Sequence, residues 1–278
     1  MTISSSRLYQ IFKYAVYAFL AANVYLFYDE ESAAAVLQFP EGVGLDQLRE
    51  AYSATIDTFA WVILLLMFEL ETWVLDDQQF TRPVALSLHG LRAVCYVAIV
   101  FAFVGYVDNM LSATDVFTVA GISDLCRLPP GNWHWALTLD EYVPITATNC
   151  ASLSDAGAFV QFQTIPAIVD MTGQSEIARL AWVDVINGAV WILVVLVLEI
   201  DVRLQERNLL EGLALRISTI VKFVLYSTLL LAAIYWGFKG GFLDFWDAFL
   251  WLVAFVFIEM NVFEWRAADH AALAAAET

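Results

Sequence analysis

Six long runs of apolar residues, separated by polar segments, dominate this chain. They cover residues 10–28, 56–75, 91–110, 182–202, 217–237 and 243–265. A helix needs about 20 mostly apolar residues to cross a bilayer, and each run is close to that length. The pattern predicts an all-α polytopic membrane protein with six transmembrane helices, in which residues 1–278 form a single membrane domain that contacts the lipid bilayer.

Composition and charge agree with a membrane protein and indicate its orientation. Hydrophobic residues make up 61% of the chain and charged residues only 15%, whereas soluble domains are nearer half apolar. A cytoplasmic N-terminus would place nine of the 13 basic residues on the inner side, as the positive-inside rule requires. We therefore expect both termini to be cytoplasmic and the long segment 111–179 to be extracytoplasmic. The net charge of −17 and the absence of a basic patch argue against a nucleic-acid partner.

Four positions recur at identical spacing in three of the apolar runs, which indicates an internal repeat. The pattern is an acid or amide, a tryptophan four residues later, a glutamate eight residues after that, and a second acid or amide two residues further on. Its members are Asp57, Trp61, Glu69 and Glu71; Asn187, Trp191, Glu199 and Asp201; and Asp247, Trp251, Glu259 and Asn261. We expect three repeated two-helix hairpins with pseudo-threefold symmetry, over residues 7–76, 91–203 (with 111–179 as an outer insertion) and 215–266.

The repeated acids allow two interpretations. The first acid and the glutamate are twelve residues apart, about 18 Å along a helix, so each of these helices places a polar or acidic group in or at the edge of the hydrocarbon core. Such groups are functional candidates by default, for transport or gating. They are also strong candidates for structural ion pairs, with basic residues in or next to the other three runs, which are Arg7, Lys13, Arg92, Arg216 and Lys222.

The tryptophans and cysteines add further predictions. Trp61, Trp191 and Trp251 lie near the middle of their helices rather than at the interface, and serve either core packing or a central constriction. Cys126 and Cys150 both lie in the segment 111–179 and are candidates for a disulfide if that side is oxidising. We expect short interfacial helices in residues 30–55, and an amphipathic stretch at 157–179 that folds back over the membrane face.

These sequence patterns exclude some functions but do not identify one. No nucleophile elbow, nucleotide-binding loop or metalloprotease motif is present, and no Cys/His cluster predicts a metal site, so enzymatic activity is disfavoured and no cofactor is indicated. The acids favour a channel or secondary transporter for a cation or a proton-coupled solute. The alternative is a non-catalytic membrane subunit or assembly partner of a larger complex, or of a homo-oligomer. A lipid-binding or lipid-modifying protein is a weaker third hypothesis.

Overall fold

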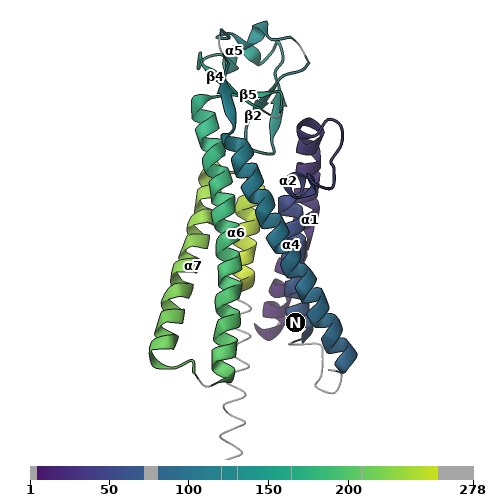
Figure 1. The fold of residues 1–278 in the computed structure, drawn as a ribbon, viewed down its shortest axis with the longest axis vertical. Helices are drawn as coiled ribbons and strands as arrows, with labels where there is room; N and C mark the ends of the chain where they lie inside the picture. Colours follow the sequence, from purple (N-terminus) through teal and green to yellow (C-terminus); the bar gives the residue numbers. More distant parts are fainter. Residues whose placement is uncertain are drawn as a thin grey trace, which may run out of the picture.

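Long helices run side by side with a small β domain at one end, in a computed structural model that describes residues 5–71, 81–119, 121–129, 131–163, 165–207 and 209–255 (Figure 1). We call the end with the β domain the domain end, and the opposite end the far end. The helices are α1 (Ser5–Gln38), α2 (Leu48–Ala51), α3 (Ser53–Glu69), α4 (Arg82–Thr114), α5 (Cys150–Leu153), α6 (Met171–Glu206) and α7 (Gly212–Lys239), and residues 242–255 are also helical.

Four of the described helices, α1, α4, α6 and α7, are long and apolar enough to cross a membrane. Each contains one of the predicted spans. The other two predicted spans correspond to α3, which has 17 residues, and to the helical residues 242–255. A mostly helical protein with four membrane-length helices is thus established, while six spans arranged as a threefold repeat stay a prediction.

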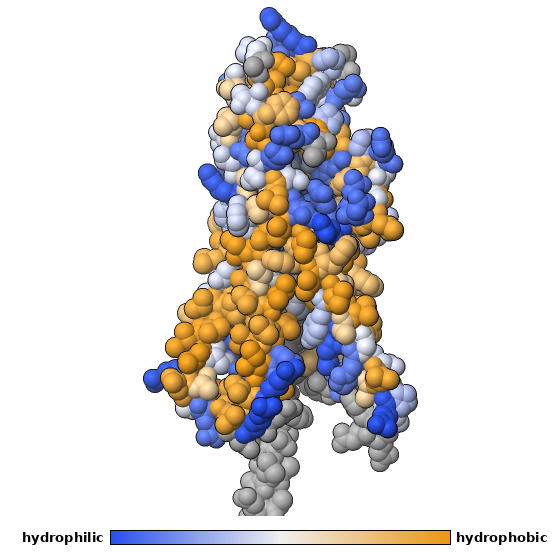
Figure 2. All heavy atoms as spheres, viewed as in Figure 1, coloured by the Kyte–Doolittle hydropathy of each residue, from blue (hydrophilic) through white to orange (hydrophobic). Residues whose placement is uncertain are grey.

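The helices have an apolar exterior of the kind that lipid requires. Phe223 on α7 and Val97 on α4 are 72% and 70% exposed, whereas α4 buries the small residues Ala102 and Gly105 against its neighbours. Helices in lipid pack through small residues because lipid tails solvate large apolar side chains as well as the protein interior does. Figure 2 shows the result, with apolar side chains over the middle of the bundle and polar ones gathered towards its two ends.

The structure corrects the prediction of short surface helices in residues 30–55. α1 continues without a break to Gln38, and only the four-residue α2 is a short helix in this segment. The cause lies in Glu31, which is 5% exposed and accepts hydrogen bonds from the backbone N–H groups of Ala54 (2.7 Å) and Thr55 (3.0 Å) at the start of α3. These N–H groups have no partner within their own helix, so α1 is held in the bundle.

The segment between α4 and α6 is a folded β domain. Its strands β1 (Val116–Thr118), β2 (His134–Ala136), β3 (Tyr142–Pro144), β4 (Phe159–Phe162) and β5 (Ala167–Asp170) form one sheet in the order β1-β4-β5-β2-β3. Only the β2–β5 pair among these is parallel. Residues 157–179 supply β4, β5 and the first turns of α6, so the predicted amphipathic stretch over the membrane face is wrong. Asp170 starts α6 early by accepting a hydrogen bond from the Gly173 N–H at 2.9 Å.

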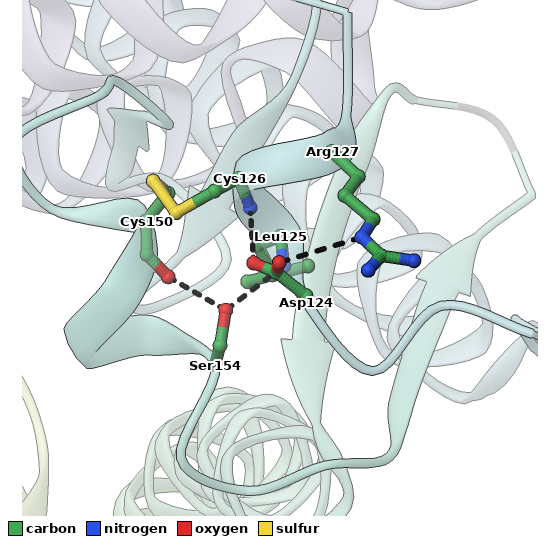
Figure 3. A network of polar contacts seen from close by, with 6 residues as sticks. All are labelled: Asp124, Leu125, Cys126, Arg127, Cys150 and Ser154. Atoms are coloured by element: carbon green, nitrogen blue, oxygen red, sulfur yellow. Dashed lines mark hydrogen bonds and ion pairs between the residues drawn. A yellow bond between two sulfur atoms is a disulfide. The ribbon is translucent and has the colours of Figure 1, made fainter.

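The predicted disulfide between Cys126 and Cys150 is present in this domain. It joins the 3₁₀ turn Leu125–Arg127 to α5, and a polar network surrounds it (Figure 3). Ser154 accepts a hydrogen bond from the Leu125 N–H at 2.8 Å and donates one to the Cys150 carbonyl at 2.7 Å. These contacts fix the two short helical elements to each other beside the sheet.

Candidate functional site

A cavity of about 110 Å³ lies in the half of the bundle nearest the domain end, with space for several water molecules. Its walls come from α1, α3, α4, α6, α7 and residues 241–251. One further part of the lining belongs to the β domain, namely the turn between β2 and β3. Every long element of the described bundle therefore contributes to one space, which we call the main cavity.

Carboxylates dominate the polar lining of the main cavity. Seven contribute to it, and the lining contains no lysine or arginine; the seven are Glu30, Glu31, Asp57, Asp140, Asp184, Asp244 and Asp247. Two basic residues near this end pair with acids outside the cavity lining. Arg49 pairs with Asp108 at 2.6 Å, and Lys239 pairs with Glu176 at 2.6 Å. The cavity therefore has a lining rich in carboxyl groups and without a basic side chain.

Neutral donors hold the deepest of these carboxylates in place. The Trp61 indole N–H donates to Asp57 at 3.0 Å, and Tyr106 donates to the same carboxylate at 3.3 Å. Asp247 accepts from the Asn23 amide at 2.7 Å and from Trp251. An indole or amide is a neutral donor, so these contacts orient the two carboxyl groups without forming an ion pair.

Three tryptophans lie together at the inner limit of the cavity. Trp61, Trp191 and Trp251 come from three different helices, and their ring centroids are 5.9, 6.4 and 6.3 Å apart. Trp191 and Trp251 are 8% and 7% exposed, and all three contribute to the cavity lining. Beyond them the bundle is filled by apolar side chains, including Leu20 and Val194. The indoles thus close the cavity towards the far end.

The far end contains a layer of ion pairs between the predicted basic and acidic positions. Lys13 on α1 pairs with Glu69 on α3, and both side chains are buried. Glu69 also accepts hydrogen bonds from Tyr14 at 3.1 Å and Tyr17 at 3.4 Å. Burial of a charge is costly without a partner, so this pair fixes α1 against α3.

Two further pairs join other helices in this layer. Arg92 on α4 pairs with Glu71 at 2.7 Å, and Lys222 on α7 pairs with Asp201 on α6 at 2.7 Å. Asp201 also accepts from the Ser218 hydroxyl at 2.6 Å. Each pair joins neighbouring helices, which is the arrangement that a structural role requires.

The remaining predicted positions are divided between these two regions and the surface. Asn187 contributes to the main cavity. Glu199 is exposed and pairs with Arg203 one turn later, at 3.0 Å, and Arg7 and Arg216 are exposed. Glu259 and Asn261 lie outside the described residues.

Sequence reasoning missed five of the cavity carboxylates. One signal in the sequence points to two of them: Asp184 precedes Asn187 by three residues, and Asp244 precedes Asp247 by three. This spacing places both members of a pair on the same helix face. Glu30, Glu31 and Asp140 have no such signal, because an unexpected extension of α1 and a turn of the β domain bring them to the cavity.

The acids surround the cavity rather than converging on one point. Among the described residues, no three His, Cys, Asp or Glu side chains meet in a way that could hold a metal ion. Asp140, which lies in the β domain, has its pKa raised to about 6, mainly because burial disfavours its charged form and also because Glu141 is adjacent. Comparison with protein-family models, curated proteins and solved structures finds no match to this chain.

Proposed function

We propose that this protein is a channel or secondary transporter for a cation, and that the main cavity is its binding vestibule. The observation that carries the proposal is the lining of this cavity by seven carboxylates and no lysine or arginine, inside a bundle of membrane-length helices. Acidic groups in a membrane protein are costly, and they are usually retained where they face water or a transported ion. Here they face one cavity.

The electrostatics of the vestibule favour cations over anions. A carboxylate roughly 5 Å from a cation contributes about 3 kcal/mol of attraction at an effective dielectric constant of about 20. Several such groups around one space raise the local cation concentration and repel anions. Because the described acids do not converge into a metal-binding cluster, the cation would keep part of its water shell and bind weakly enough to move on.

The structure corresponds to a closed conformation in this proposal. Trp61, Trp191 and Trp251 close the inner limit of the vestibule, and the buried Lys13–Glu69 pair closes the bundle further towards the far end. Transport would require the three indoles to separate. Under the predicted orientation the domain end is extracytoplasmic, so the vestibule is an entry site from outside.

The predicted threefold repeat is part of the same proposal. The three indoles that meet occupy corresponding positions of the three predicted hairpins. In two of them the indole also hydrogen-bonds to the acid four residues earlier, as Trp61 does to Asp57 and Trp251 to Asp247. The third helix has Asn187 at that position, so the ring of acids would be interrupted on one side.

Reconstitution into vesicles tests the proposal. We would measure uptake of Na⁺, K⁺, H⁺ and tetramethylammonium with the parent protein and with the double variant Asp57→Asn/Asp247→Asn, which keeps the acceptors for the indoles and removes two charges. We expect at least a tenfold loss of cation flux, because two attractions of about 3 kcal/mol disappear. The control is Glu199→Gln, whose exposed side chain lies outside the cavity lining. Equal flux in all three proteins, or none in any, would refute the proposal.

A membrane subunit of a larger complex is the second candidate. The observation that favours it is the disulfide-bonded β domain, which extends beyond one end of the membrane-length helices (Figure 1). Mass determination of the native complex in mild detergent separates the two functions. Partner chains in fixed stoichiometry that are lost when residues 115–170 are replaced by a short linker would support the subunit function.

A further inference from the structure

The turn between β2 and β3 covers the main cavity. Thr138, Leu139 and Asp140 contribute to its lining, and all other lining residues come from the helices or from Gly241 beside the last one. The same three residues also line a second cavity of about 320 Å³, between the β domain, α1, α2 and α4. The turn is therefore part of the wall between the two cavities, together with Asn109 on α4. Figure 1 shows the β domain placed over the end of the helices.

One glutamine at the end of α1 hydrogen-bonds to this turn, and Leu139 of the turn also packs against an apolar cluster that includes Met110 on α4 and Ile177 on α6. The Gln38 side-chain amide donates to the Leu139 carbonyl at 3.1 Å and to the Tyr142 hydroxyl at 3.1 Å. Tyr142 in turn donates to the Leu139 carbonyl. The two hydrogen bonds from this single side chain are worth on the order of a fivefold or larger change in equilibrium when lost.

The turn is well ordered by its own hydrogen bonds. The Thr138 hydroxyl accepts from the backbone N–H groups of Asp140 (3.2 Å) and Glu141 (3.0 Å). Leu137 N–H donates to the Glu141 carbonyl at 2.9 Å. A turn that satisfies its own backbone groups can leave the helices as a unit, because separation does not expose unpaired polar atoms.

Asp140 brings a carboxyl group within electrostatic range of the acids of several elements. It interacts electrostatically with Glu30 and Glu31 on α1, with Asp184 on α6 and with Asp244. On its own element it has Glu141 beside it. No basic side chain contributes to this part of the lining. When Asp140 is ionised, the turn in its place against the helices therefore holds a buried carboxylate that has Glu141 beside it and no basic partner in the cavity lining.

We propose that the β2–β3 turn is a lid over the vestibule, held by Gln38 and released when Asp140 ionises. This inference rests on the proposed function only in assigning the lid to cation entry; the lid itself is a property of the fold. Acid closes the lid and neutral pH opens it.

The direction of the pH effect follows from the two states of Asp140. In the seated turn its pKa is about 6, against an ordinary value of 3.8. A group whose pKa is raised in one state stabilises that state while it is protonated, and the stabilisation is lost as the pH rises through the raised value. Between pH 5 and pH 7.5, the ratio of open to closed lid therefore rises about tenfold.

Cysteine labelling from the domain end tests the lid without any need for transport. Ala248, which lines the main cavity, is replaced by cysteine, and the labelling rate with a cationic methanethiosulfonate reagent is measured in reconstituted vesicles at pH 5 and pH 7.5. The same reporter in an Asp140→Asn background corrects for the pH dependence of the thiol itself. Protein without the added cysteine provides the blank for the buried Cys95.

We expect the rate ratio of parent to Asp140→Asn to rise about tenfold between the two pH values. Gln38→Ala should raise labelling at both pH values by about fivefold or more. The control Asp155→Asn, an exposed acid of the β domain, should leave both rates unchanged. A ratio that does not change with pH, together with no effect of Gln38→Ala, would overturn the lid. Cation flux measured in the same vesicles separates the two proposals. Labelling that depends on pH, without cation flux, supports the lid and refutes cation transport. Cation flux with labelling that does not depend on pH supports cation transport and refutes the lid.

Discussion

The buried ion pair between Lys13 and Glu69 gives the sharpest prediction about stability. Lys13 is 2% exposed and the Glu69 side chain 8%, so neither charge is solvated by water. In Lys13→Met the lysine stem is replaced by an apolar side chain of similar length, and Glu69 loses its cationic partner. Removal of one member of a buried pair typically costs about 3–5 kcal/mol, because the remaining charge stays buried without compensation.

Hydrogen bonds around Glu69 set the expected magnitude within that range. Tyr14 and Tyr17 still donate to the carboxylate in the variant, which offsets part of the lost attraction. We therefore expect a loss of about 3 kcal/mol in the free energy of unfolding, or roughly 6–12 °C in the melting temperature of a protein of this size. Thermal unfolding in detergent, followed by tryptophan fluorescence, measures it.

Two further variants make the experiment decisive. Lys13→Met/Glu69→Met replaces both charges by apolar groups, and should recover most of the loss because no charge remains buried. Lys239→Met breaks the exposed pair with Glu176 and should leave the melting temperature close to that of the parent, since exposed pairs contribute little. The reasoning is refuted if Lys13→Met is as stable as Lys239→Met, or if the double variant is less stable than the single one.

Three other predictions concern local packing, the helix start and the disulfide. Gly105→Ala should lower the free energy of unfolding by roughly 1–3 kcal/mol, because the added Cβ would overlap the Arg49 carbonyl. Gly90 has open space around it, so Gly90→Ala should be neutral or stabilising. Chemical denaturation compares the two variants. Glu31→Ala should lower the free energy of unfolding by about 1 kcal/mol, because two backbone N–H groups of α3 lose their acceptor. Glu31→Gln keeps an acceptor oxygen and should keep the stability of the parent. An equal loss of stability in both variants would contradict this explanation. Cys126→Ser should destabilise the β domain by about 3 kcal/mol and make it sensitive to limited proteolysis while the helices remain protected; uniform protease resistance would disprove the local role.

The parts of the fold that could be predicted from sequence are those governed by local apolar pattern. Membrane-length helices follow from runs of apolar residues, because the bilayer demands a fixed length of apolar helix whatever the tertiary structure. The β domain could not be foreseen in the same way. Its strands have three or four residues each, too short for a clear alternating pattern, and the sheet pairs β2 with the distant β5.

The candidate site was only half predictable for a related reason. The fixed spacing of Asp57 and Trp61 identified residues that meet in the cavity, because repeated spacing reports a shared helix face. Asp140 belongs to the same cavity but lies in a turn of another domain. Its position depends on how the sheet is seated on the helices, which no pattern within residues 137–141 encodes. Long-range placement of this kind is set by tertiary packing and not by local periodicity.

The hydrogen bond between Asn23 and Asp247 joins the first long helix to the last, and this has a consequence for biosynthesis. A chain made from its N-terminus completes α1, α3, α4, α6 and α7 before residue 247 leaves the ribosome. Until then the main cavity lacks one wall, and Trp61 and Trp191 lack their third indole. A partly synthesised chain thus has an unsealed acidic space, and the three indoles can meet only after the helix that carries Trp251 has been made. Premature termination before this helix would therefore leave a membrane-inserted product that is open where the finished protein is shut.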